Sequence, residues 1–157
     1  MKTVIFLASI LPLLAASIPL SPRAGAPAFV PIPANCTVIN PLPHAAGVAS
    51  VNGYMPASNF TTSHLLYAAY FDAPYNQTMQ SELCLEQCYG YGYPANCKSA
   101  LLAYWVPIPK GYYGSSGNEM SHTACLLYDA YLDPNLFVAA PSGQYVNETA
   151  GSIYCPR

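Results

Sequence analysis

Six cysteines constrain the fold of this chain more than any other feature of its sequence. They are Cys36, Cys84, Cys88, Cys97, Cys125 and Cys155. An even number of cysteines in an oxidising compartment indicates a set of disulfides, although spacing alone leaves many pairings open. Cys84 and Cys88 are separated by three residues, and no second Cys or His pair follows at the spacing of a zinc finger. We therefore expect three disulfides rather than a metal site.

The N-terminus predicts that the chain enters such a compartment. Lys2 supplies a positive charge, the run from Val4 to Ala16 is almost entirely apolar, and Ala15-Ala16-Ser17 offers small residues for cleavage. This order is typical of a secretory signal peptide, here residues 1–17, and the run is too short to span a bilayer. We expect a secreted, extracellular protein, free or associated with the cell wall, with no membrane span.

The cysteines fall on predicted secondary structure. Residues 78–89 favour a helix, with Thr78 as the N-cap and glycines beyond its C-terminal end. Cys84 and Cys88 are i and i+4 on this helix, so their sulfurs leave the same face. Residues 63–71, 99–106 and 124–132 are rich in Leu and Tyr and predict strands. Joining each helix cysteine to a different strand would fix the helix on a sheet.

The segments CLEQC, CKSALLAYW and CLLY resemble the PAN/apple domain. The resemblance covers about residues 63–155 and implies an α+β fold, with one helix packed on a curved antiparallel sheet. It implies the disulfides Cys88–Cys97 and Cys84–Cys125, with Cys36–Cys155 joining the two ends. Signal peptide, low charge and cysteine pattern together are similar to those of secreted fungal proteins.

Residues 18–58 carry eight of the chain's 16 prolines and predict an extended N-terminal arm, with a strand or two along the core and a disordered beginning. Residues 59–157 then form the PAN/apple-like disulfide domain. Residues 107–121 predict a long loop.

Charged residues make up only 8% of the chain, and the mature net charge is about −3, from seven acidic residues and four basic ones once Lys2 is removed. The scattered Lys and Arg argue against a nucleic-acid partner. Four N-glycosylation sequons would instead help solubility. Their acceptors are Asn35, Asn59, Asn76 and Asn147.

Catalytic chemistry finds little support in the sequence. His44, His64 and His122 have no partner that the sequence identifies. Glu82 and Glu86 are i and i+4 on one helix, whereas glycosidase carboxylates flank the scissile bond from opposite sides. The acidic residues considered for a cation lack the dense spacing of a calcium loop; they are Asp72, Glu119, Asp129 and Asp133. We expect no enzyme activity, no metal and no cofactor.

Tyrosine is the unusual component, with 14 in the chain beside one tryptophan. We expect four tyrosines in the sheet core, namely Tyr67, Tyr70, Tyr104 and Tyr128. Exposed aromatic clusters mark interaction sites, and the ligand-binding candidates are Tyr91, Tyr93, Tyr112 and Tyr113.

These features favour a non-enzymatic recognition module, because PAN/apple domains bind proteins or carbohydrates. The expected partner is an extracellular glycan of the cell wall or another extracellular protein. One alternative is a protease-resistant structural or effector-like protein with no small ligand. The other is a small hydrolase without a recognisable motif. The sequence sets neither the ligand nor the oligomeric state.

Overall fold

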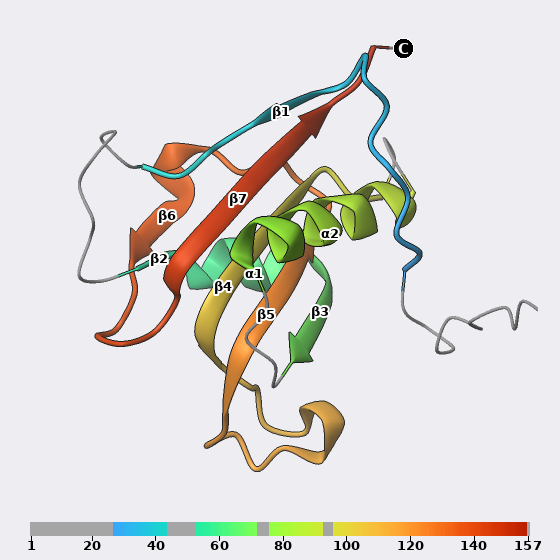
Figure 1. The fold of residues 1–157 in the computed structure, drawn as a ribbon. Coiled ribbons are helices and arrows are strands. Elements are labelled where there is room, and N and C mark those ends of the chain that lie inside the picture. The colour runs from blue at the N-terminus through green and yellow to red at the C-terminus, as the bar shows by residue number, and fades with distance from the viewer. Residues whose placement is uncertain (1–26, 44–52, 72–75, 93–95, 157) are drawn as a thin grey trace, which may run out of the picture.

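The computed structural model describes residues 27–43, 53–71, 76–92 and 96–156. In these residues the chain forms two α-helices and two antiparallel sheets (Figure 1), so the predicted α+β class is confirmed. The larger sheet has the order β1-β7-β4-β5-β3, formed by Thr37–Ile39, Val146–Tyr154, Ser99–Pro107, Met120–Tyr128 and Leu65–Phe71. The smaller sheet pairs β2 (Tyr54–Pro56) with β6 (Phe137–Ala139).

Helix α2 (Gln77–Gly90) lies across one face of the large sheet, as Figure 1 shows. Alternation along β4 builds two cores, because successive side chains of a strand point to opposite faces. Ala100 and Leu102 pack beneath α2, together with the cysteines. Leu101 and Ala103 pack on the other face, against Phe60 of helix α1 (Ser58–His64) and the chain around β6. The sheet is therefore covered on both faces.

Three disulfides are present, which confirms the expected number, and Cys88–Cys97, Cys84–Cys125 and Cys36–Cys155 are the pairs that the resemblance implies. Cys84–Cys125 joins α2 to β5, with a Cα–Cα distance of 5.7 Å. Cys36–Cys155 joins the residue before β1 to the residue after β7. The N-terminal segment is thus fixed along the sheet edge by both a disulfide and strand pairing.

The main helix begins earlier than its sequence suggests. Asn76, not Thr78, is the N-cap, and its Oδ1 accepts hydrogen bonds from the backbone N–H groups of Thr78 and Met79 at 3.0 and 3.4 Å. Asn is among the strongest N-cap residues, which explains why it displaces Thr from this role. At the other end the helix includes Gly90, which was expected to lie beyond it, and Gly92 follows the C-cap Tyr91 with a φ of 113°.

Several other boundaries differ from expectation. The single-helix prediction missed α1, which occupies Ser58–His64, so the strand expected from Ser63 begins at Leu65. The predicted loop is shorter, because β4 continues to Pro107 and β5 begins at Met120. Within the predicted arm, residues 37–39 and 54–56 form strands, as part of that expectation allowed. The beginning of the arm was expected to be disordered over about 15 residues after the signal peptide. Residues 18–26 lie outside the described residues, whereas residues 27–32 are described, and the Val30 N–H donates to the Glu86 carbonyl at 3.2 Å.

Within the described ranges, no helix has the length and apolar character needed to cross a membrane.

Candidate functional site

Two of the predicted binding tyrosines, Tyr91 and Tyr112, lie on opposite sides of the large sheet. Tyr91 is half-buried on the α2 side of the sheet, with its ring centroid 6.4 Å from that of Tyr67. Tyr112 is half-buried on the opposite side, where its ring meets Tyr70 edge-on at 5.1 Å and its hydroxyl donates to the carbonyl of Ala68. Both rings pack into the protein, so neither of these two tyrosines presents a free platform.

The remaining tyrosine predictions divide as follows. Tyr128 is fully buried, as predicted, whereas Tyr67, Tyr70 and Tyr104 are only half-buried at the margins of the cores. Tyr93 lies outside the described residues, and the structure does not describe the side chain of Tyr113.

Trp105 is one of the aromatic side chains that the fold presents to solvent. It is the only tryptophan of the chain, and it lies near the end of β4 with 44% of its surface exposed. A second exposed aromatic group, the stacked pair Tyr131 and Tyr154, has its centroids 4.3 Å apart. Lys98 lies over Tyr131, 5.6 Å from the ring centroid, so the Tyr131 ring already contacts two other side chains. Trp105 is therefore the better candidate for a contact surface.

The backbone that carries Trp105 is strained. Its φ is 54°, a left-handed value that bulky residues rarely adopt. Tyr145 and Asn147, at the start of β7, both have a φ of 50°. The pairing of β4 with β7 shifts register between Leu102 and Tyr104, and the Tyr145 N–H donates to the Trp105 carbonyl at 3.4 Å. Non-glycine strain of this kind gathers at functional sites and costs about 1–3 kcal/mol at each residue.

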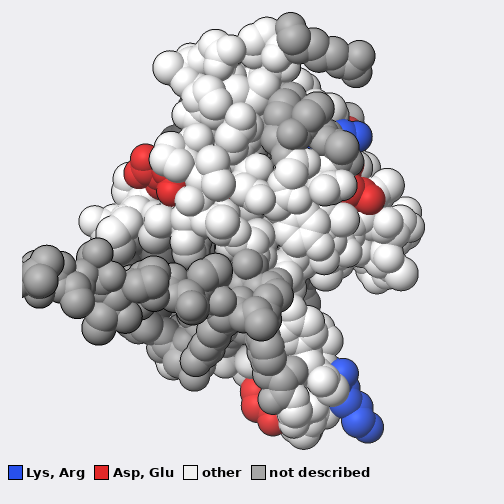
Figure 2. All heavy atoms as spheres, turned by 90° about the vertical axis from the view of Figure 1, so that its right-hand side faces the viewer, with Lys and Arg blue, Asp and Glu red and all other residues white. Residues whose placement is uncertain are grey.

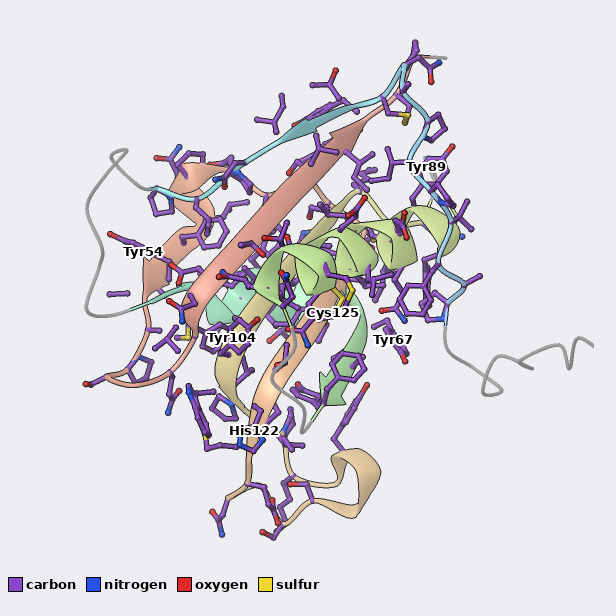
Figure 3. The ribbon with its side chains drawn as sticks, viewed as in Figure 1. Tyr54, Tyr67, Tyr89, Tyr104, His122 and Cys125 are labelled. Atoms are coloured by element: carbon purple, nitrogen blue, oxygen red, sulfur yellow. A yellow bond between two sulfur atoms is a disulfide. The ribbon has the colours of Figure 1, made fainter. Side chains whose placement is uncertain are left out.

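His122 of β5 lies beside Trp105. The two ring centroids are 4.8 Å apart, with the planes tilted by 58°. Figure 3 shows His122 on the lower part of the sheet, where the β4–β5 hairpin extends beyond the helix. The His122 Nδ1 atom is buried and has no hydrogen-bond partner among the described residues. A buried unpaired polar atom costs about 1–3 kcal/mol, so strain and an unpaired group coincide at this place.

The hairpin loop beyond Trp105 is held in shape by one carboxylate. Glu119 accepts hydrogen bonds from the hydroxyls of Ser115 and Ser116 and from the backbone N–H groups of Ser116, Gly117 and Asn118. The two serine hydroxyls, followed by the backbone donors, lower the pKa of Glu119 from 4.5 to about 2. Met120 follows directly and is exposed opposite Pro107. We call Trp105, His122 and Met120 the Trp105 patch.

A separate groove of about 660 Å³ runs between α2, β7 and the N-terminal segment. Glu82 and Glu86 line it, together with Thr78 and Thr149, which are the hydroxyl residues of the Asn76 and Asn147 sequons. The Gln77 side chain donates to the Asn147 carbonyl at 2.6 Å, which brings these two sequons together. All four sequon asparagines are exposed, as glycan attachment requires. Glycans on Asn76 and Asn147 would flank this groove.

Of the two histidines that the structure describes, His64 has a carboxylate partner. Its Nδ1 lies 2.8 Å from Asp129 Oδ1, and both side chains are about 40% exposed. No hydrogen bond joins His64 to a serine, threonine or cysteine in the part of the chain that the structure describes. His44 and Asp72 lie outside that part. Across the described ranges, no three His, Cys, Asp or Glu residues gather as metal ligands would.

The sequence argument missed Trp105 because it gave weight to the number of tyrosines. Its exposed position near the end of β4 follows a register shift that the sequence does not show. The chain matches no family model, and comparison with curated proteins and with solved structures finds no match either.

Proposed function

We propose that this protein is an extracellular, non-enzymatic recognition module that binds a neutral cell-wall polysaccharide through the Trp105 patch. The main observation behind this proposal is that Trp105 is exposed and has a positive φ. It lies beside His122, whose Nδ1 atom has no hydrogen-bond partner among the described residues. The strained backbone and the unpaired buried nitrogen both lower the stability of the fold without a structural benefit. Such features are expected at positions that function has selected. The patch replaces the tyrosine cluster as the proposed site.

The chemistry of the patch suits a sugar ring. The flat, apolar face of a pyranose packs well on an indole ring, whose N–H remains available at its edge. A neutral polysaccharide also fits the weakly charged surface: Figure 2 shows one face on which the charged side chains are few and isolated. An anionic glycan would need clustered Lys or Arg side chains, and the chain has only five of these residues in total.

Extracellular location is part of the proposal. Three disulfides indicate an oxidising compartment, and residues 1–17 have the pattern of a signal peptide. Attachment of α2 to its sheet through Cys84–Cys125 and Cys88–Cys97 supports a PAN/apple-like origin, a family in which carbohydrate and protein binding are common. We keep this relationship as a proposal based on the cysteines.

The test is retention of the mature, secreted protein on insoluble chitin, β-glucan and cellulose. We expect binding to at least one matrix, and we expect reduction and alkylation to abolish it. Trp105→Gly is the informative variant, because glycine accepts the φ of 54° without strain. Its melting temperature should equal or exceed that of the unchanged protein, while its retention falls at least tenfold. Tyr154→Ala, which removes an exposed ring elsewhere, should bind normally.

Trp105 also reports binding directly, since no other tryptophan contributes to fluorescence. Soluble oligosaccharides of the retained polymer should shift its emission and protect it from acrylamide quenching. If the protein passes through every matrix, or if Trp105→Gly is retained unchanged, the proposal is wrong. Specific capture of one secreted protein would then favour a protein partner. Stability to proteases with no ligand at all would favour a purely structural role.

The hydrolase alternative has one observation in its favour, the His64–Asp129 pair. An activity screen on glycans, esters and peptides would test it, with His64→Ala and Asp129→Asn as paired variants. Turnover that both variants abolish would establish an enzyme. Turnover that neither variant changes would exclude this pair from the chemistry.

A further inference from the structure

An open, apolar pocket lies on the far side of α2 from the groove beside β7. Its volume is about 260 Å³, and it lies between the first half of α2 and the neighbouring strands β3, β4 and β5. The Cys84–Cys125 disulfide and Leu102 line it, and all three residues are almost completely buried. These side chains give the pocket a firm, apolar interior.

Three large apolar side chains stand exposed around the pocket. Phe29 is 55% exposed, Met79 48% and Phe71 42%, and each comes from a different segment of the chain. A hydrogen bond of 3.2 Å from the Val30 N–H to the Glu86 carbonyl holds the N-terminal segment against α2, which brings Phe29 to the pocket. Large apolar side chains that are clustered and exposed to solvent in this way mark a binding surface.

Polar groups in the pocket are few and uncharged. No Lys, Arg, Asp or Glu is among the described residues that line it. Gln80 already accepts a hydrogen bond from the Tyr104 hydroxyl at 2.8 Å. Gln87, only 4% exposed, adds a second amide to the lining. A charged ligand would lose its hydration here without gaining a counter-charge, which is costly.

The fold prevents this space from closing. Cys84–Cys125 fixes the separation of α2 from β5, and the bond between Gln80 and Tyr104 fixes α2 to β4. These two links fix the position of α2 over the sheet beside the pocket. A pocket that covalent and polar links hold open is already formed before a ligand arrives.

We propose that this pocket binds a small, uncharged aromatic molecule of one or two fused rings, independently of the Trp105 patch. Pockets for drug-sized ligands begin at roughly 300 Å³, so this one accepts a ring system but neither a helix nor a sugar chain. Its apolar interior provides the affinity, and the Gln87 amide suits a hydroxyl or amine on the ring. Phe29, Phe71 and Met79 would cover the bound molecule.

The probe is 2-naphthol, with naphthalene-2-sulfonate as a charged molecule that has the same rings. The mature protein is labelled with ¹³C at its methionine methyl groups, which are those of Met55, Met79 and Met120. We expect 2-naphthol to shift the Met79 signal in a saturable manner and to leave Met55 and Met120 in place. The sulfonate should bind at least tenfold more weakly.

Leu83→Trp tests the location, because Leu83 lines the pocket and a larger ring there would fill it. We expect this variant to bind 2-naphthol at least tenfold more weakly. Val138→Trp makes a similar enlargement at an exposed position of β6 and should bind normally. An unchanged Met120 signal would verify that both variants fold, because Met55 lies opposite Val138 in the pairing of β2 with β6.

Three results would overturn the proposal: no saturable shift, a shift of Met55 or Met120 instead of Met79, or normal binding by Leu83→Trp. Preference for an apolar peptide over 2-naphthol would also overturn it, since the site would then be a protein-docking surface. None of these results depends on Trp105, so the proposal for the pocket and the proposal for the polysaccharide site are tested independently.

Discussion

Gly151 of β7 lies so close beneath Leu85 of α2 that a Cβ atom on Gly151 would be 2.7 Å from Leu85 Cδ2. The same atom would be 2.6 Å from Val38 Cγ1 of β1. The helix therefore packs tightly against the β7 side of the sheet, while the apolar pocket remains open toward β3. Glycine at this one position permits the close approach.

Gly151→Ala should destabilise the protein by about 1–3 kcal/mol, the usual cost of overpacking a tight core. The backbone at Gly151 is not in the left-handed region, so the effect would report space alone. Urea denaturation measures it. In a Leu85→Ala background the cost should shrink, because much of the obstructing side chain is gone. An equal cost in both backgrounds would show that Leu85 is not the constraint.

The disulfides should differ in their contribution to stability. Cys36–Cys155 links residues 119 apart in sequence, and Cys88–Cys97 residues only nine apart. Loop-closure entropy predicts losses of about 5 and about 3 kcal/mol when each pair is replaced by alanine. Denaturation of the two double variants checks the order. A larger loss for Cys88–Cys97 would mean that local packing outweighs the entropy of the unfolded chain.

The Glu119 loop should respond to acid. The folded-state pKa of Glu119, about 2, lies below its usual 4.5 because serine hydroxyls and backbone N–H groups donate to the carboxylate. The stabilisation is therefore fully present above about pH 4.5 and is lost as the pH falls toward 2. NMR amide shifts of Ser116, Gly117 and Asn118 should follow this titration. Glu119→Gln should remove the transition, whereas Glu82→Gln should leave it unchanged.

The number of disulfides could be predicted from the even count of cysteines behind a signal-peptide pattern. Their pairing was available only as what the PAN/apple resemblance implies, and the structure contains those pairs. The three predicted strands also correspond to β3, β4 and β5, although their ends move by several residues. Long runs of Leu and Tyr identify strands more reliably than they locate boundaries.

The exposed candidate residues could not be found in this way. Trp105 follows the register shift between Leu102 and Tyr104 in the pairing of β4 with β7, a long-range irregularity that leaves no local signal. β7 itself was missed, since its sequence, VNETAGSIY, contains a sequon and a glycine in place of an apolar run. Likewise, Tyr112 was a candidate for ligand binding because it lies in a Gly-rich loop, but its ring packs against that of Tyr70, which is distant in sequence. The number of aromatic residues in a sequence therefore does not show which of their rings the fold leaves exposed.

Asn76 combines two roles that substitution can separate. Its Oδ1 caps α2, and its Nδ2 would carry the glycan of the Asn76-Gln77-Thr78 sequon. Asn76→Asp keeps a capping oxygen and adds a negative charge that suits a helix N-terminus, whereas Asn76→Ala loses the cap at a cost of about 1 kcal/mol. Thr78→Ala removes the sequon and leaves both the cap and its backbone donors in place.

Expression in a glycosylating host, followed by mass spectrometry and urea denaturation, would resolve the two roles. All three variants should lose the mass of one glycan, and Asn76→Ala alone should show the additional loss of stability. Equal stability of Asn76→Ala and Thr78→Ala would mean that the cap contributes nothing. If no variant loses mass, the Asn76 sequon is unused, and the cap alone explains this asparagine.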